Sequence, residues 1–166
     1  YKNGVTVEIA NTDAGGRLVL ADGLMAAGGT RSEIIIDAAT LTGAAIMATG
    51  SEYSALFALD QAIADKVKKS AADVNEPVWQ LPLESWHQEK CSSAFADTAN
   101  SSTQKGGGAG GASNAAGFLT RFVPNEGKGW LHMDLAAAYN GSGNNLYGAG
   151  ATGQGIATIA NLLNKA

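Results

Sequence analysis

The stretch Asn11-Thr12-Asp13-Ala14-Gly15-Gly16-Arg17-Leu18 decides the fold, because a strand pattern precedes it and a helix pattern follows it. Residues 5–10 alternate weakly in hydrophobicity and predict a strand, whereas residues 17–27 carry the apolar spacing of a mostly buried helix. A strand, a tight polar turn and a helix are typical of an α/β sheet, which binds ligands at the carboxyl ends of its strands. Asp13 could bind a cation there and Arg17 could hold an anion. Alternatively, Asp13 only caps the helix and Arg17 is an ordinary surface charge.

The next hundred residues repeat the alternation of strand and helix. Residues 33–39 form a continuous apolar run, which predicts a central parallel strand covered on both faces. A short helix at 44–49, a strand at 53–59 and a helix at 61–74 capped by Asp60 follow. We see no internal repeat and no domain boundary. The prediction is therefore one α/β domain over residues 1–166, a doubly wound, mostly parallel sheet with helices on both faces.

The second half of the chain is less regular. Residues 97–111 contain no large apolar side chain and predict a long flexible loop. Residues 130–135 predict a last strong strand. The other expected segments are an extended stretch at 78–82, a helical turn at 84–89, a helix at 112–123, a Gly/Asn loop at 139–150 and an amphipathic helix at 152–165. The apolar face of that last helix consists of Ile156, Ile159, Ala160 and Leu163.

Composition excludes several classes of protein. The 166 residues suffice for one domain with a core, and a net charge of −4 argues against a nucleic-acid platform. No signal peptide opens the sequence, and no apolar run reaches about 18 residues, so no membrane span is predicted. The single cysteine, Cys91, forms no internal disulfide, is interpreted as a small buried hydrophobe, and predicts a reducing compartment. The start at Tyr1 lacks an initiator Met, so we expect a longer polypeptide.

A second candidate site is the stretch Ala38-Ala39-Thr40-Leu41-Thr42-Gly43, which follows the most apolar strand. Its exposed backbone groups could hold the main chain of a peptide, and Gly43 would allow close approach. A plain strand-to-helix turn with threonine caps is the alternative. The glycines at 106, 108 and 111 form the pattern GxGxxG, which occurs in nucleotide-binding loops. Because no strand pattern precedes them, we do not favour nucleotide binding.

Two histidines are further candidates for chemistry. His132 and Asp134 lie on the same side of the predicted last strand, which would suit a metal or a proton relay. A core histidine bonded to backbone is the interpretation we favour. His87, beside Trp86, is interpreted as a surface residue.

The first stretch resembles the signature of the leucine aminopeptidase family of two-metal exopeptidases, Asn-Thr-Asp-Ala-Glu-Gly-Arg-Leu. It differs only at residue 15, where Gly stands in place of a metal-binding Glu. The stretch Asp37-Ala-Ala-Thr-Leu-Thr-Gly43 also resembles this family, in the same order along the chain. Residues 79–82, 130–134 and 150–153 fit as well. The most similar branch is bacterial peptidase B, and the chain corresponds to the second half of the family's catalytic domain.

The resemblance implies a cytoplasmic homohexamer that removes amino-terminal residues from peptides with two divalent ions, zinc, manganese or magnesium. It implies that Asp13 is a metal ligand and that Arg17 acts in catalysis by positioning a bicarbonate. The implied peptide contacts are Asn11 and Ala14 on the leaving side and Thr40, Leu41 and Gly43 around the first residue, with the Leu41 carbonyl receiving the free amine.

Part of the family's catalytic apparatus is missing. The family's other ligands, a lysine and two aspartates, and its catalytic lysine lie upstream of the signature, where this chain has only a short segment. Gly15 supplies no carboxylate, although a pair of cations needs several anionic ligands. We therefore expect the chain alone to have no peptidase activity. A catalytically inactive relative kept for assembly or binding is the alternative.

Overall fold

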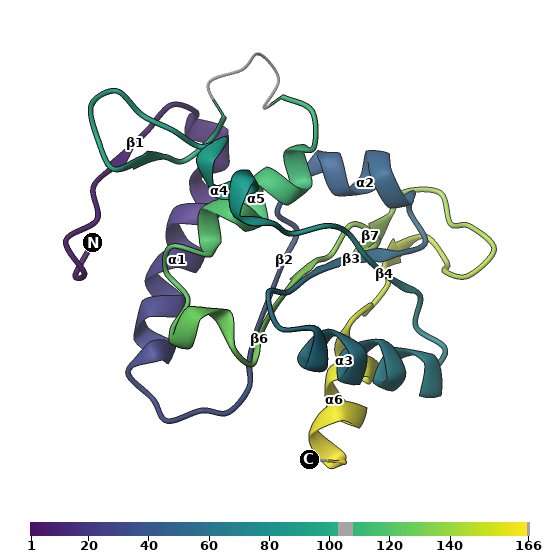
Figure 1. Cartoon of the computed structure of the whole chain (residues 1–166). Helices are drawn as coiled ribbons and strands as arrows, with labels where there is room; N and C mark the ends of the chain where they lie inside the picture. The colour runs from purple at the N-terminus through teal and green to yellow at the C-terminus, as the bar shows by residue number, and fades with distance from the viewer. Residues whose placement is uncertain (103–107, 166) are drawn as a thin grey trace.

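A four-stranded sheet organises the molecule, and helices cover both of its faces (Figure 1). The computed structural model describes residues 1–102 and 108–165. The strands are β2 (Ile35–Ala39), β6 (Trp130–Asp134), β3 (Ser54–Phe57) and β4 (Val78–Gln80), in that spatial order. Strands β2 and β6 are parallel, as are β3 and β4, whereas β3 runs antiparallel to β6. The predicted class, an α/β fold with mostly parallel strands and flanking helices, is confirmed.

Strand β6, not β2, occupies the centre of this sheet. Every residue of β6 is buried, and it pairs with β2 on one side and β3 on the other. The prediction that residues 33–39 form a central strand is wrong for the described sheet, because β2 lies at its edge and is mostly half-buried. An apolar run predicts a strand, but the order of strands is set by pairing between distant segments.

The pleat of β6 divides the core into two layers, because successive side chains point to opposite faces. Leu131 and Met133 pack on one face with helices α3 (Gln61–Asp73) and α6 (Ile156–Asn164). Trp130 packs on the other face with helices α1 (Gly15–Gly28) and α5 (Gly111–Leu119). Helix α2 (Gly43–Thr49) joins that second face beside β3. Figure 1 shows these layers on either side of the sheet.

Asp60 connects the start of α3 to the start of the central strand. Its Oδ1 accepts a hydrogen bond from Ala62 N at 2.9 Å, as the predicted cap requires, and its Oδ2 accepts one from Gly129 N at 3.0 Å. These donations, that of Gly129 above all, hold the pKa of Asp60 below its ordinary value. The predicted inward residues Ile63 and Val67 are buried.

The first strand lies outside the main sheet. Strand β1 (Val7–Glu8) pairs in parallel with β5 (Thr98–Ala99) as a separate two-stranded sheet. The prediction of a flexible loop at 97–111 is therefore wrong for Thr98–Ala99, and Thr98 and Asn100 are fully buried. The predicted glycine motif lies partly outside the described residues, because Gly106 belongs to 103–107.

The remaining elements are short. They are the 3-10 turns η1 (Thr12–Ala14) and η3 (Asn125–Gly127), helix α4 (Ser85–Glu89), and the paired strands β7 (Tyr139–Asn140) and β8 (Gly150–Ala151). The predicted helix at 112–123 ends at Leu119, and the predicted loop at 139–150 contains the β7–β8 pair. Within the described ranges, no helix is both long and apolar enough to cross a membrane.

The orientation of α6 differs from a simple amphipathic helix. Ile156 and Leu163 of the predicted apolar face are 71% and 62% exposed, whereas Thr158 and Leu162 are buried. Polar bonds fix this orientation, because the Glu76 carboxylate accepts hydrogen bonds from Thr158 N at 2.8 Å and from its hydroxyl at 2.5 Å. The hydrophobic spacing alone therefore indicated the helix but not the side that faces the core.

A substitution at Gly129 tests how tightly the chain before β6 packs against the residue before β2. Its φ is +74°, and a Cβ there would lie 2.1 Å from the Glu33 carbonyl oxygen. We expect Gly129→Ala to lower the free energy of unfolding by roughly 2–4 kcal/mol, measured by urea denaturation. Gly23→Ala, at an exposed helical position with open space around it, should instead raise it by about 0.5–1 kcal/mol. Equal effects of the two substitutions would contradict this interpretation.

Candidate functional site

A cavity of about 220 Å³ lies where the turn before α1 meets the turn before α2 and the start of α5. It is lined by Asn11, Asp13, Ala14, Arg17, Leu41, Thr42, Gly43, Ala44, Ser101, Ser102, Gly111 and Asn114. Most of the candidate residues from the two sequence stretches therefore surround one space. Thr40 and Gly15 adjoin these turns but do not line the cavity.

The first turn leaves the Asp13 carboxylate available for a ligand. Asn11, rather than Asp13, caps turn η1, because its Oδ1 accepts a hydrogen bond from Asp13 N at 2.9 Å. Helix α1 then begins after Ala14 without any side-chain cap. Asp13 is exposed. The structure thus does not support the alternative in which Asp13 serves only as a helix cap.

Asn100 holds this turn in place, although no sequence pattern pointed to this residue. Its Oδ1 accepts hydrogen bonds from Ala10 N at 3.0 Å and Asn11 N at 3.1 Å. Its Nδ2 donates to Asn11 O at 2.7 Å and Ala14 O at 3.4 Å. One buried amide thus pairs with four backbone groups, which fixes the turn relative to β5. The only available signal was an asparagine in a stretch of small polar residues, which resembles a loop.

Arg17 reaches the same place from the first turn of α1. Its Nη1 donates to the Asn100 carbonyl oxygen at 2.8 Å, and its Nε is buried with no hydrogen-bond partner among the described residues. Burial lowers the pKa of Arg17, an effect opposed by nearby groups that include Asp134. Because a guanidinium stays charged at any physiological pH, Arg17 is a half-buried cation on the wall of the cavity. Such a group suits an anion.

The second turn is anchored by Asp134, at the end of β6. Asp134 accepts hydrogen bonds from Leu41 N, Thr42 N and the Thr42 hydroxyl. The Thr42 hydroxyl also accepts one from Ala45 N at 3.0 Å, so the threonine cap of the alternative interpretation is present. The start of α1 lies close to this second turn, because a Cβ placed on Gly16 would lie 3.6 Å from Leu41 Cδ1.

His132 belongs to the core. Its Nδ1 lies 2.5 Å from Asp37 Oδ1, and Trp130 Nε1 donates to Asp37 Oδ2 at 2.8 Å. Its ring stacks on Phe57 at a centroid distance of 5.8 Å, and it does not line the cavity. The predicted core histidine is thus confirmed, but its partner is a carboxylate rather than backbone. His87 accepts a hydrogen bond from Glu84 N at the start of α4, which is also away from the cavity.

The lining of the cavity does not by itself make a two-metal centre. Asp13 is the only acidic residue among the lining residues. Within residues 1–102 and 108–165, no group of three or more His, Cys, Asp or Glu side chains could hold a metal ion. Cys91 is buried behind the wall, where burial raises the pKa of its thiol and its Sγ donates to Asn114 O at 3.6 Å. It is the small buried residue expected from the sequence.

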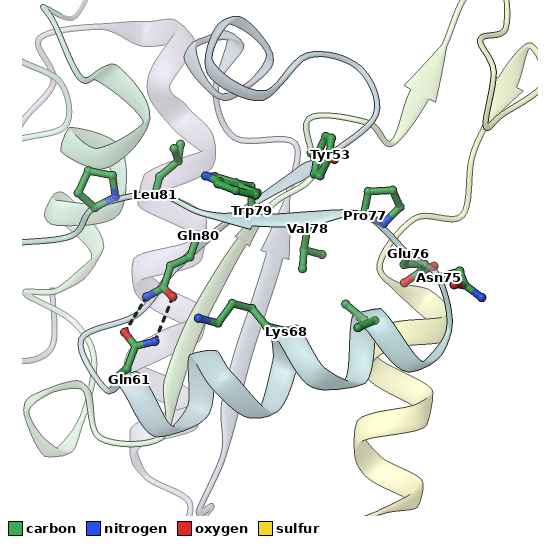
Figure 2. A pocket seen from close by; sticks show the side chains of 13 residues that line it. Tyr53, Gln61, Lys68, Asn75, Glu76, Pro77, Val78, Trp79, Gln80 and Leu81 are labelled. Carbon is green, nitrogen blue, oxygen red and sulfur yellow. Dashed lines mark hydrogen bonds between the residues drawn. The ribbon is translucent and has the colours of Figure 1, made fainter.

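A larger cavity of about 990 Å³ lies elsewhere, between β4 and α3 (Figure 2). Gln61 and Gln80 meet at one end of it and exchange amide hydrogen bonds of 3.2 and 3.1 Å (Figure 2). Glu76, its acidic group, is already bonded to the start of α6. None of the residues singled out from the sequence for chemistry lines this cavity, so the smaller one is the better candidate.

Comparisons with known proteins show what the whole chain is similar to. Residues 1–160 match the sequence model for the catalytic domain of the cytosol aminopeptidase family. Among solved structures, the bottromycin maturation enzyme BotP in complex with Mn is 37% identical, with a TM-score of 0.89. A mutant tomato leucine aminopeptidase is 36% identical, with a TM-score of 0.87. The alignments cover 98% and 99% of this chain but only 36% and 31% of those proteins. The chain therefore spans about a third of their length.

Asn100→Ala tests whether this side chain holds the first turn. We expect the free energy of unfolding to fall by about 2–4 kcal/mol, because four backbone groups lose their partner. Hydrogen exchange at the Ala10 and Asn11 amides, measured by NMR, should accelerate about tenfold. Asn161→Ala removes an amide bonded to Ser70 and is the control, which should leave those amides unchanged. Unaltered exchange at Ala10 in the Asn100 variant would contradict the assignment.

Proposed function

The chain belongs to the cytosol aminopeptidase family, and on that premise we propose that it is part of a metal-dependent aminopeptidase that releases amino-terminal residues from peptides. The observation that carries this proposal is the single cavity on which Asp13, Arg17 and Leu41 converge from two separate turns. Within the family, the peptidase B branch is the one we propose, on the resemblance of the sequence.

The roles of the residues follow their positions around the cavity. The exposed Asp13 carboxylate would be one ligand of the metal site, and the half-buried Arg17 would hold a bicarbonate and so act in catalysis. Asn11 and Ala14 would contact the leaving side of the peptide. The other turn would contact its first residue through Leu41 and Gly43, which line the cavity, and through Thr40, which adjoins them.

The described residues do not fit two divalent ions without further ligands. Manganese, zinc or magnesium would, when bound, activate water and polarise the peptide carbonyl. Two such ions need several anionic groups, whereas this cavity presents one carboxylate, at Asp13. Gly15, at the position of the family's Glu, adds none. We therefore propose that the chain by itself is inactive and that a longer protein would have to complete the site.

An inactive relative that serves in assembly or binding is a second candidate, and Gly15 is the observation that favours it. The loss of a ligand at this position would be tolerated if hydrolysis were no longer needed. Stoichiometric binding of two Mn²⁺ ions by the full-length protein with Gly15 in place would count against this candidate.

Assembly and location follow from the family as proposals. We propose a homohexamer in the cytoplasm that acts on peptides, with neither nucleic acid nor a membrane as partner. Several large apolar side chains are well exposed, as expected for a surface covered by other subunits: Val19, Met47, Trp86 and Phe95. The net charge of −4 also suits a protein that does not bind nucleic acid.

Gly15→Glu should be accepted without strain. Gly15 has a helical φ of −65°, and no heavy atom lies within 4 Å of the position of a Cβ. A better helix former and a negative charge in the first turn of α1 should raise the melting temperature by about 2–5 °C. Added Mn²⁺ should raise it further in this variant but not in the uncharged control Gly15→Gln. Equal responses of both variants to Mn²⁺ would argue against a ligand at this position.

The activity itself is tested on amino-acid p-nitroanilides with Mn²⁺. The 166-residue chain should cleave none of them, with or without Gly15→Glu, because its cavity offers too few ligands. The full-length protein carrying Gly15→Glu should cleave them. No cleavage by that protein would overturn the proposed aminopeptidase function.

A further inference from the structure

Arg121 carries a guanidinium group that has no hydrogen-bond partner in the part of the chain that the structure describes. It lies two residues after the end of α5, where its backbone N–H donates to the Phe118 carbonyl oxygen at 3.4 Å and the next residue, Phe122, is buried. The side chain of Arg121 is half-buried, and its Nε is buried without a partner. A buried donor on a permanent cation is costly when it stays unsatisfied, so this group calls for an acceptor.

Asp97 is a carboxylate whose charge Arg121 influences, but it is already occupied. Its Oδ2 accepts hydrogen bonds from Thr6 N at 2.8 Å and from the Thr6 hydroxyl at 2.7 Å. These bonds hold the pKa of Asp97 below its ordinary value, and the charge of Arg121 makes a smaller contribution. Within residues 1–102 and 108–165, no ion pair joins Arg121 to a carboxylate. The guanidinium can therefore accept a partner that comes from solvent.

Arg121 lines a cavity of about 820 Å³ between the second half of α1, the first residues of the chain and the segment that follows α5. Helix α1 packs against that segment, because a Cβ on Gly28 would lie 3.3 Å from Pro124 Cβ. The apolar part of the lining includes Met25 and Val123. This cavity shares no residue with the one around Asp13, and its volume is in the usual range for small-molecule sites, about 300–1,000 Å³.

The charges on the lining indicate which ligand would fit. Lys2 and Arg121 are the cations among the lining residues, and Asp22 is the carboxylate. Neither Lys2 nor Asp22 makes a hydrogen bond or ion pair through its charged group to a described residue. Two cations and one carboxylate leave one net positive charge, which a singly charged anion would neutralise. A phosphate carries roughly −1.5 to −2 at pH 7 and would be repelled more strongly by Asp22.

We propose that this cavity is a second binding site, for a small organic molecule with one carboxylate and an apolar body. The guanidinium of Arg121 pairs with the carboxylate oxygens, and Lys2 adds a second positive charge. The apolar body lies against Met25 and Val123. This site is separate from the cavity around Asp13 and does not rest on the proposed function. The competing possibility is that Arg121 serves only the stability of the fold.

Binding of 4-phenylbutyrate to the 166-residue chain separates the two possibilities. This probe carries one ionised carboxylate at pH 7, and 4-phenylbutanol has the same skeleton without the charge. NMR follows the side-chain Nε of Arg121 and the methyl group of Met25. Phenylbutyrate should shift both resonances, and phenylbutanol should bind about fivefold more weakly or worse, because it cannot form the charged hydrogen bonds.

Substitutions of the charged groups separate binding from folding. Arg121→Gln should weaken phenylbutyrate binding about fivefold, and the control Arg31→Gln, at an exposed arginine outside the cavity, should leave it unchanged. Asp22→Asn should strengthen binding about twofold, because it removes a repelling charge, and a purely structural Arg121 would not produce this change. If Arg121→Gln does not fold, Lys2→Gln, at an exposed residue, should weaken binding about twofold.

Three results would overturn the inference: equal binding of the two probes, unchanged phenylbutyrate binding by the folded Arg121→Gln or Lys2→Gln chain, or no shift at Arg121 Nε in the unaltered chain. Shifts around Arg17 in place of Arg121 would assign the anion to the cavity around Asp13 and would also overturn it. Tighter binding of 4-phenylbutyl phosphate than of phenylbutyrate would contradict the choice of a carboxylate as ligand.

Discussion

The fold depends on strand β6, which is buried on both faces and paired along both edges. Its alternating side chains assign Leu131 and Met133 to one helical layer and Trp130 to the other. Its last residue, Asp134, lies at the carboxyl end of the strand, beside the turn that joins β2 to α2. A single strand of five residues thus supplies the centre of the core and the anchor of the candidate site.

Each turn of the site has local caps and is also anchored by a residue far away in the sequence. Asn100 bonds the backbone of the Asp13 turn from 89 residues away, and Asp134 bonds the Leu41 turn from 93 residues away. Both anchors are buried polar groups whose hydrogen bonds are satisfied, an arrangement that gives a unique geometry. The backbone of each turn is thus held independently of the side chains that face the cavity, such as Asp13 and Arg17.

The sequence predicted the elements better than their arrangement. The cap at Asp60, the helix after Gly16 and the strand at 130–135 depend on local patterns, and the structure contains all three. The place of β2 at the edge and the pairing of β1 with β5 depend on contacts between distant segments, which no local pattern encodes. The same reason explains why Asp13 and Leu41 were found as motifs, whereas Asn100 looked like part of a loop.

The pairing of β2 with β6 has a consequence for folding during synthesis on the ribosome. Asp37 meets its partner His132 from 95 residues further along the chain. At a synthesis rate of about 5–20 residues per second, β2 emerges from the ribosome roughly 5–20 s before β6 exists. During that interval its isoleucines have no described strand to pair with, and an unpaired apolar strand invites aggregation. Because the only described partner of β2 is made this late, β2 stays exposed until β6 has been synthesised and the two strands have paired.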